Sequence, residues 1–136
     1  MRRVVADPDK AHELNIAAYS EGDECYRSGR YREALKLFQA ALAADPLDGD
    51  AWHAIGSCYD ALGKPAKAAA AYQEAISLLP VERHPDLQFN IGNAHLDLGQ
   101  YSDALRMYDL IPRTSSVWSV ASKNRALALQ RLGNGG

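Results

Sequence analysis

Small and apolar residues return at helical spacing along the chain, in segments separated by glycine or proline. Residues three, four and seven positions apart share one face of a helix, so each segment predicts an amphipathic helix. The predicted helices span residues 10–28, 31–44, 49–62, 65–79, 85–98, 101–111 and 116–132. The pattern therefore predicts an all-α fold of seven helices.

An internal repeat joins the first six helices into three pairs. Shifting the segment that follows Trp52 back by 34 residues, or forward by 36, brings similar residues into register. The recurring positions are a first glycine (Gly22, Gly56, Gly92), a turn glycine (Gly29, Gly63, Gly99), an alanine (Ala34, Ala68, Ala104) and an aromatic residue (Phe38, Tyr72, Tyr108). A fixed period of this length is typical of stacked helix pairs.

Each recurring residue type has a physical reason in such a pair. The first glycine lets the second helix approach closely, and the alanine supplies a small facing surface. The aromatic residue is expected to fill the space between units. The turn glycine can adopt the left-handed conformation that ends a helix. The predicted helix boundaries agree with these pairs: Asp48, Pro65 and Pro85 lie at helix starts, and Pro46 and Pro80 lie just after helix ends.

The seventh helix does not repeat the pattern. Pro112 ends the third unit early, and Thr114, Ser115 and Ser116 offer caps for a last helix that Gly133 would stop. We expect an apolar stripe that shields the end of the stack, made of Trp118, Val120, Ala121, Ala126, Leu127 and Leu129.

The middle unit resembles the tetratricopeptide repeat, with Trp52, Ile55, Gly56 and Tyr59 on its first helix and Ala68, Tyr72 and Pro80 after it. The resemblance implies one domain over residues 1–136, a right-handed superhelical stack of three helix-turn-helix repeats. The repeats would span about 15–48, 49–82 and 85–111, with a capping helix at about 116–132. Ala18 and Glu21 in the first unit, and His95 and Ile111 in the third, depart from the family pattern.

Composition and charge exclude several kinds of partner and reaction. The net charge is −2, with no basic patch for nucleic acid or a membrane surface. Two separated cysteines, Cys25 and Cys58, fit inert thiols in a reducing compartment, and we predict a cytoplasmic protein with no membrane span. No histidine pair has metal-ligand spacing, and no nucleophile–base motif occurs. We therefore predict no catalytic residue, no metal and no cofactor.

The resemblance implies a concave groove lined by the first helices, which would bind another polypeptide. Helical spacing predicts the groove residues Tyr19, Asp23, Tyr26, His53, Ser57, Asp60, Phe89, Asn93 and Leu96. The aromatic rings could anchor apolar side chains, the carboxylates favour a partner with basic residues, and the asparagine amide can pair with a peptide backbone. The alternative is that the rings only pack between helices and the acids are only solvated.

Three roles remain open at this point. The first is a general peptide-binding adaptor or scaffold. The second is a chaperone like those of type III secretion translocators, whose pattern the residues Phe38-Gln39, Asp45, Asp48, Gly56 and Cys58 resemble. The third is a structural module that forms a weak homodimer through its first helix. Tetratricopeptide domains that hold acidic chaperone tails use a basic clamp, and the matching positions Tyr19, Asp23, Ala54, Asp86 and Asn90 are not basic. We therefore predict that such tails do not bind.

Overall fold

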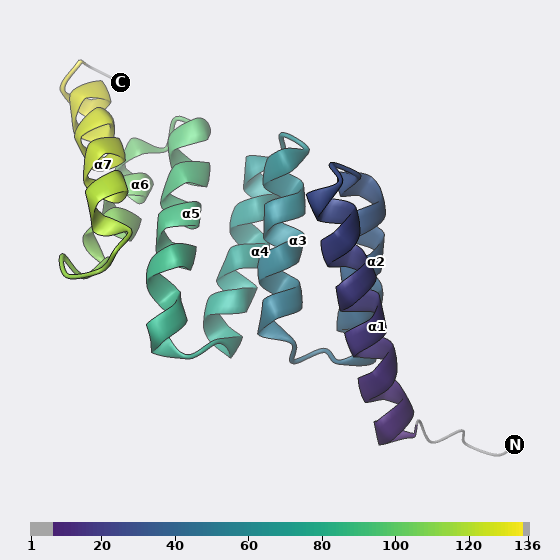
Figure 1. Ribbon diagram of the computed structural model, residues 1–136. Coiled ribbons are helices and arrows are strands. Elements are labelled where there is room, and N and C mark those ends of the chain that lie inside the picture. Colours follow the sequence, from purple (N-terminus) through teal and green to yellow (C-terminus); the bar gives the residue numbers. More distant parts are fainter. Residues whose placement is uncertain (1–6, 135–136) are drawn as a thin grey trace, which may run out of the picture.

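The computed structural model describes residues 7–134, and in that part the chain forms α-helices and no strand. Seven α-helices and one short 3-10 helix follow in order (Figure 1): α1 (Pro8–Arg27), α2 (Tyr31–Ala44), α3 (Gly49–Ala61), α4 (Pro65–Leu78), η1 (Val81–Arg83), α5 (His84–Asp97), α6 (Tyr101–Asp109) and α7 (Trp118–Gly133). The predicted all-α class and the six paired helices are confirmed. The ends of the predicted domain, residues 1–6 and 135–136, lie outside the described residues.

Local chemistry sets the helix boundaries. Gly29, Gly63 and Gly99 have φ angles of 77°, 72° and 73°, the left-handed conformation predicted for the turn glycines. The Asp48 side chain caps α3, accepting a hydrogen bond from the Ala51 amide at 3.0 Å. Pro65 begins α4, where a proline lacks no needed donor. The turn prediction therefore holds in each of the three units, and the helix starts predicted at Asp48 and Pro65 hold in the second.

The first glycine of each unit lies directly under the aromatic ring of its own second helix. A Cβ atom added at Gly22, Gly56 or Gly92 would lie only 2.8, 2.5 and 2.5 Å from a ring carbon of Phe38, Tyr72 and Tyr108, respectively. The rings also reach the next unit, since Phe38 clusters with Ile55 and Tyr72 with Leu87. Each ring thus fills space within its unit as well as between units.

The capping helix departs from the prediction. It begins at Trp118, two residues later than expected, and no side chain of the Thr-Ser-Ser run caps its first turn in the way predicted. Ala121 and Ala128 are fully buried, and Trp118 is partly buried against the third-unit cluster. Four residues of the predicted stripe are exposed: Ala126, Val120 (49%), Leu127 (38%) and Leu129 (45%). The predicted stripe was therefore wrong except at Trp118 and Ala121.

Polar contacts explain the rotation of α7. The Arg125 side chain pairs with Asp109 of α6 at 2.6 Å, and the Asn124 amide donates to Asn93 of α5 at 2.9 Å. These contacts turn the alanine face inward, and they leave the larger apolar side chains on other faces. Apolar spacing alone could not show which of several apolar faces would be buried.

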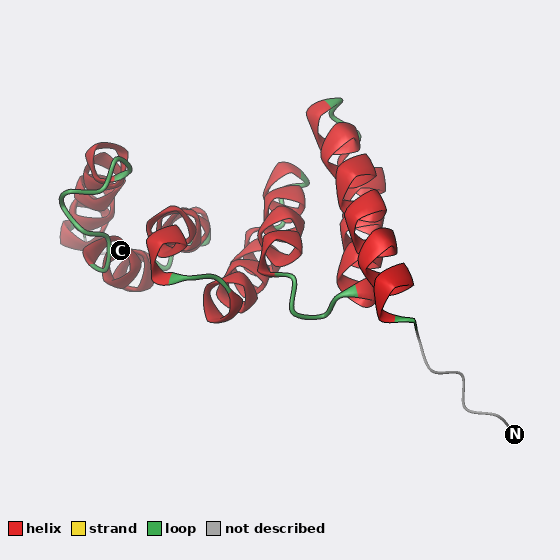
Figure 2. Cartoon of the chain, turned by 60° about the horizontal axis from the view of Figure 1, so that its bottom comes forward, coloured by secondary structure: helices red, strands yellow, loops and turns green. Residues whose placement is uncertain are grey.

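The helix pairs stack into a curved array (Figure 2). Figure 1 shows α1, α3 and α5 in the nearer layer, with α2, α4 and α6 behind them. The first helix of each unit therefore lies on the same side of the stack, as the repeat predicts. Within residues 7–134, none of the helices combines the length and hydropathy that crossing a bilayer requires.

Candidate functional site

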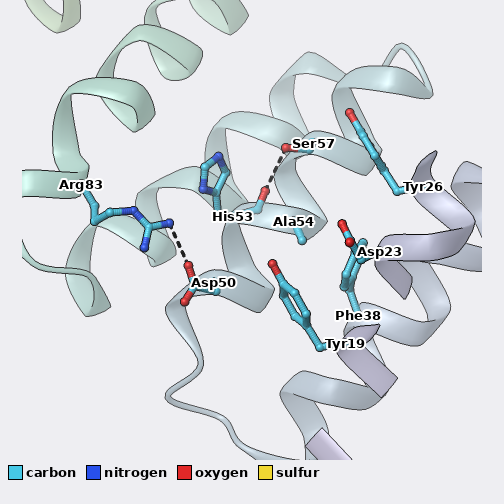
Figure 3. A pocket seen from close by; sticks show the side chains of 9 residues that line it. All are labelled: Tyr19, Asp23, Tyr26, Phe38, Asp50, His53, Ala54, Ser57 and Arg83. Atoms are coloured by element: carbon cyan, nitrogen blue, oxygen red, sulfur yellow. Dashed lines mark hydrogen bonds and ion pairs between the residues drawn. The ribbon is translucent and has the colours of Figure 1, made fainter. Parts of the chain in front are cut away.

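A pocket of about 280 Å³ opens between α1 and α3 on the side of the first helices (Figure 3). It brings together five residues predicted from sequence: Tyr19, Asp23, Tyr26, His53 and Ser57. The other lining residues are Phe38, Asp50, Ala54 and Arg83. The pocket therefore combines aromatic rings, carboxylates and one fixed positive charge.

A second pocket of about 670 Å³ continues the first along α1. The two pockets share Tyr19, Asp23 and Asp50. The second is also lined by His12, Asn15, Ile16, Ser20, Asp45 and Asp48. No lysine or arginine is among the described side chains that line it, whereas four aspartates are. The joined hollow is thus acidic at the end formed by α1 and the start of α3.

The four aspartates are not equivalent. Asp48 caps α3 with one oxygen and accepts from the Asn15 amide at 2.8 Å with the other. Asp45 accepts from the Leu47 amide at 3.1 Å, which closes a turn. Asp23 and Asp50 instead pair with exposed arginine side chains, Arg27 and Arg83. Exposed ion pairs are weak, so these two carboxylates remain available to a ligand.

Tyr19 lies at the junction of the two pockets. Its ring packs on Phe38 with the ring centroids 5.3 Å apart. Burial, and then the charges of Asp50, Asp23 and Asp48, raise the pKa of the Tyr19 hydroxyl. The hydroxyl therefore stays protonated at neutral pH and can donate a hydrogen bond, while its ring offers an apolar surface.

Two α3 residues form the far wall. Burial, and then the charge of Arg83, lower the pKa of His53, so its ring is neutral at pH 7. The His53 ring lies edge-on to Tyr72, with centroids 5.8 Å apart. The Ser57 hydroxyl donates to the His53 carbonyl at 3.2 Å. This wall is polar and adds no positive charge of its own at neutral pH.

Asp60 stands apart from the two pockets. Its carboxylate accepts a hydrogen bond from the Tyr72 hydroxyl at 2.6 Å. Burial raises the pKa of Asp60, and that hydrogen bond partly offsets the shift. The contact ties the carboxylate to the aromatic residue that covers Gly56, which gives Asp60 a packing role within the second unit.

The third-unit residues Phe89, Asn93 and Leu96 form a separate group. Phe89 and Leu96 are partly buried against the cluster that contains Tyr108. The Asn93 carbonyl oxygen accepts from the Tyr108 hydroxyl at 2.7 Å and from the Asn124 amide at 2.9 Å. The structure therefore divides the predicted site residues among the α1–α3 hollow, the packing of the second unit and the packing of the third unit.

Asn15 and Arg83 are among the lining residues of the hollow that sequence reasoning missed. Asn15 is 8% exposed, and its amide donates to the Ala41 carbonyl at 2.9 Å as well as to Asp48. Its position among apolar helix residues was a signal, because a buried amide needs partners. Arg83 comes from η1, in the longer connection between the second and third units, and no helical pattern predicts how far such a side chain reaches.

Neither cysteine thiol lies in an environment that would make it reactive. Cys25 and Cys58 are free and buried, and burial raises the pKa of the Cys58 thiol to about 11. The thiolate is the reactive form, so Cys58 is unreactive at neutral pH. Among the residues that the structure describes, no cluster of three or more histidine, cysteine or acidic side chains could hold a metal ion.

The model of the tetratricopeptide repeat matches residues 19–86, half of the chain. The chain belongs to the tetratricopeptide repeat family. This tetratricopeptide repeat chain is 33% identical over 75 residues to the general transcriptional corepressor trfA of Dictyostelium discoideum. The match covers 55% of the chain but only 5% of the corepressor, so the chain spans a small part of that relative.

Solved structures of two other proteins share the fold. The first tetratricopeptide repeat domain of Spaghetti (RPAP3), bound to the HSP90 peptide SRMEEVD, gives a TM-score of 0.78 at 19% identity, covering 90% of this chain and 95% of that one. The type III secretion chaperone SycD of Yersinia enterocolitica, in complex with a peptide of the translocator YopD, gives 0.72 at 21% identity, covering 88% and 93%. At these identities the likeness concerns the fold.

Proposed function

We propose that this tetratricopeptide repeat chain is an adaptor or scaffold that binds an extended segment of another polypeptide. The segment lies in the α1–α3 hollow, with a basic side chain near Asp23 and Asp50 and apolar side chains against Tyr19 and Tyr26. The role is binding rather than catalysis, in the cytoplasm, with no nucleic acid or membrane as partner. One observation carries the proposal: two joined pockets combine accessible aromatic rings with carboxylates that only exposed arginines neutralise.

The family neighbours support a peptide as the ligand. Spaghetti and SycD were both solved with bound peptides. The charge of the hollow, however, argues against an acidic peptide. Of the five positions that match the basic clamp, Tyr19, Asp23 and Ala54 line the pocket, and a carboxylate ligand would meet Asp23 and Asp50 there. Charges of equal sign suppress association, so the preference should be for basic segments.

A pair of matched peptides tests the proposal. The acidic peptide SRMEEVD is compared with SRMKKVK, in which lysine replaces the three acids. Each is titrated into ¹⁵N-labelled protein, which detects weak binding through amide shifts. We expect SRMKKVK to shift the amides of Tyr19, Asp23 and His53 and to bind about tenfold more tightly than SRMEEVD, because two favourable ion pairs of about 0.5–1 kcal/mol each replace repulsion.

The same titration defines failure. Equal binding of the two peptides, or tighter binding of SRMEEVD, would refute the electrostatic preference. Amide shifts confined to the third unit would place the site elsewhere. A binding constant that does not weaken when salt rises from 50 to 300 mM would also contradict an interaction with exposed carboxylates, since salt screens such charges.

A secretion-chaperone role is the second candidate, and the structural likeness to SycD favours it. In that role the hollow would hold an unfolded stretch of a secreted client. Purification from the native cell followed by mass spectrometry separates the two roles. A secreted, membrane-active protein as the main co-purifying species favours the chaperone, whereas a cytoplasmic assembly favours the adaptor.

Self-association is the third candidate. Leu14 and Ile16 are 56% and 54% exposed on α1, and exposed apolar side chains of this size favour contact with another surface. Sedimentation of the protein at increasing concentration gives the answer. A dimer that weakens when Ile16 is replaced by serine, and that competes with SRMKKVK, would mean that a second copy covers the hollow.

A further inference from the structure

Arg83 is the one permanently cationic side chain among the nine that line the first pocket. Its Nη2 atom lies 2.8 Å from the Oδ1 atom of Asp50. Figure 3 shows Asp50 between Arg83 and Tyr19, with the Arg83 guanidinium directed toward the carboxylate. The chain thus places a basic side chain of its own on the carboxylate that the proposed function assigns to a partner.

The connection that carries Arg83, between the second and third units, differs from the connection between the first and second units. After the second unit, η1 and a two-residue longer repeat spacing place Arg83 at the start of α5. The backbone there is held, since the Arg83 amide donates to the Pro80 carbonyl at 2.9 Å and the His84 ring bonds the Leu79 carbonyl at 2.9 Å. The connection after the first unit, residues 45–48, has two aspartates and no basic residue.

The backbone that carries Arg83 is fixed by hydrogen bonds, but the ion pair between the Arg83 and Asp50 side chains is weak. The side chains of Arg83 and Asp50 are 44% and 50% exposed. An exposed pair of this kind changes an equilibrium by about fivefold at most. A basic side chain from a partner can therefore take the place of Arg83 on Asp50 without a change in the helices.

We infer that Arg83 is a specificity-determining residue that competes in cis with the basic side chain of the bound segment for Asp50. This inference rests on the proposed function, because it concerns the same hollow. Arg83 lowers the affinity for any basic segment, so only a segment that also fits the Tyr19 and Tyr26 surface binds well. When the segment leaves, Arg83 returns to Asp50 and neutralises it.

Substitution of Arg83 tests the competition with SRMKKVK as the probe. In Arg83→Gln the competitor is gone, and we expect the peptide to bind about two- to fivefold more tightly than to the wild type. Asp50→Asn removes the shared carboxylate and should weaken binding by about the same factor. When Arg83→Gln is added to Asp50→Asn, it should not tighten SRMKKVK binding, because the carboxylate for which Arg83 and the peptide compete is absent.

Arg30→Gln is the matched control. It makes the same change in net charge, and Arg30 pairs with Glu33 at the turn between α1 and α2, away from both pockets. We expect it to leave the affinity for SRMKKVK unchanged. Equal tightening by Arg30→Gln and Arg83→Gln would show a general charge effect and overturn the inference.

The remaining outcomes separate the inference from the proposed function. If Asp50→Asn weakens binding but Arg83→Gln leaves it unchanged or also weakens it, the competition is refuted and the proposed function survives. If Arg83→Gln tightens binding as strongly in the Asp50→Asn background, Arg83 acts through another group and the inference fails. If SRMKKVK shifts no amide of the hollow in the wild type or in Arg83→Gln, the proposed function itself fails.

Discussion

Replacing Gly56 by alanine tests the close packing on which the helix pairs depend. The new Cβ atom would lie 2.5 Å from Cε1 and 2.6 Å from Cδ1 of Tyr72. Carbon atoms in good contact are about 3.5–4.0 Å apart, so the ring has to move by about 1 Å. Tyr72 is only 1% exposed and its hydroxyl is bonded to Asp60, which leaves the ring little room.

Two opposing effects set the change in the free energy of unfolding caused by Gly56→Ala. Alanine is about 1 kcal/mol more favourable than glycine inside a helix. Overpacking a filled site costs about 1–3 kcal/mol, and the short contact to a buried ring places this site in the upper part of that range. We therefore expect Gly56→Ala to lower the free energy of unfolding by about 1–2 kcal/mol, a loss of about 3–6 °C in Tm for a chain of this size.

A double-mutant cycle isolates the contact. Urea unfolding, followed by circular dichroism, is measured for Gly56→Ala, Tyr72→Leu and the two together. In the Tyr72→Leu background the ring is absent, so alanine at position 56 should be neutral or stabilising by up to about 1 kcal/mol. An equal loss in both backgrounds would refute the reasoning, because the cost of alanine would then be independent of Tyr72.

Three further predictions concern other parts of the structure. Asn15→Ala should destabilise the protein by about 1–3 kcal/mol in urea unfolding, because it removes the buried hydrogen bond from the Asn15 amide to the Ala41 carbonyl and a second one to the Asp48 carboxylate. Tyr26→Ala should weaken SRMKKVK binding with little change in helicity, because Tyr26 lines the pocket. Phe89→Ala should mainly lower stability, by about 2 kcal/mol, because Phe89 packs in the third unit. Stability should fall by about 1–3 kcal/mol between pH 9 and 11, because burial raises the folded pKa of Cys58 to about 11 and the unfolded thiol loses its proton first.

Matched measurements make these outcomes decisive. Tyrosines and lysines also titrate at alkaline pH, so the Cys58 effect is the difference between the wild type and Cys58→Ala, and equal slopes would contradict it. Asn15→Asp keeps the size of the side chain but places a charge beside Asp48, and it should be worse than Asn15→Ala. Unfolding by Tyr26→Ala would show that its ring belongs to the core rather than to the hollow.

The repeat predicted the fold well because its signals are local. A turn glycine must be left-handed, and a glycine under a ring must lack a side chain, so the spacing of Gly22, Gly56 and Gly92 fixed how each pair packs. The capping helix lacks those signals. Its rotation depends on contacts of Arg125 and Asn124 with helices distant in sequence, which apolar spacing does not encode.

The candidate site was predicted in part for the same reason. Helical spacing brought Tyr19, Asp23, Tyr26, His53 and Ser57 to one hollow, since all lie on first helices with a shared face. It could not predict that Arg83 reaches in from a connection, because a connection has no period. It also could not distinguish carboxylates that cap or close turns, such as Asp48 and Asp45, from those facing a ligand.

The double use of Asp48 couples α1 to the start of α3. The same carboxylate starts α3 and holds the Asn15 amide of α1, so undocking α1 also strips a partner from the cap of its neighbour. Amide protons of α1 and of the first turn of α3 should consequently exchange with solvent in one concerted opening. The end of the stack that forms the hollow is thereby kept from fraying one helix at a time.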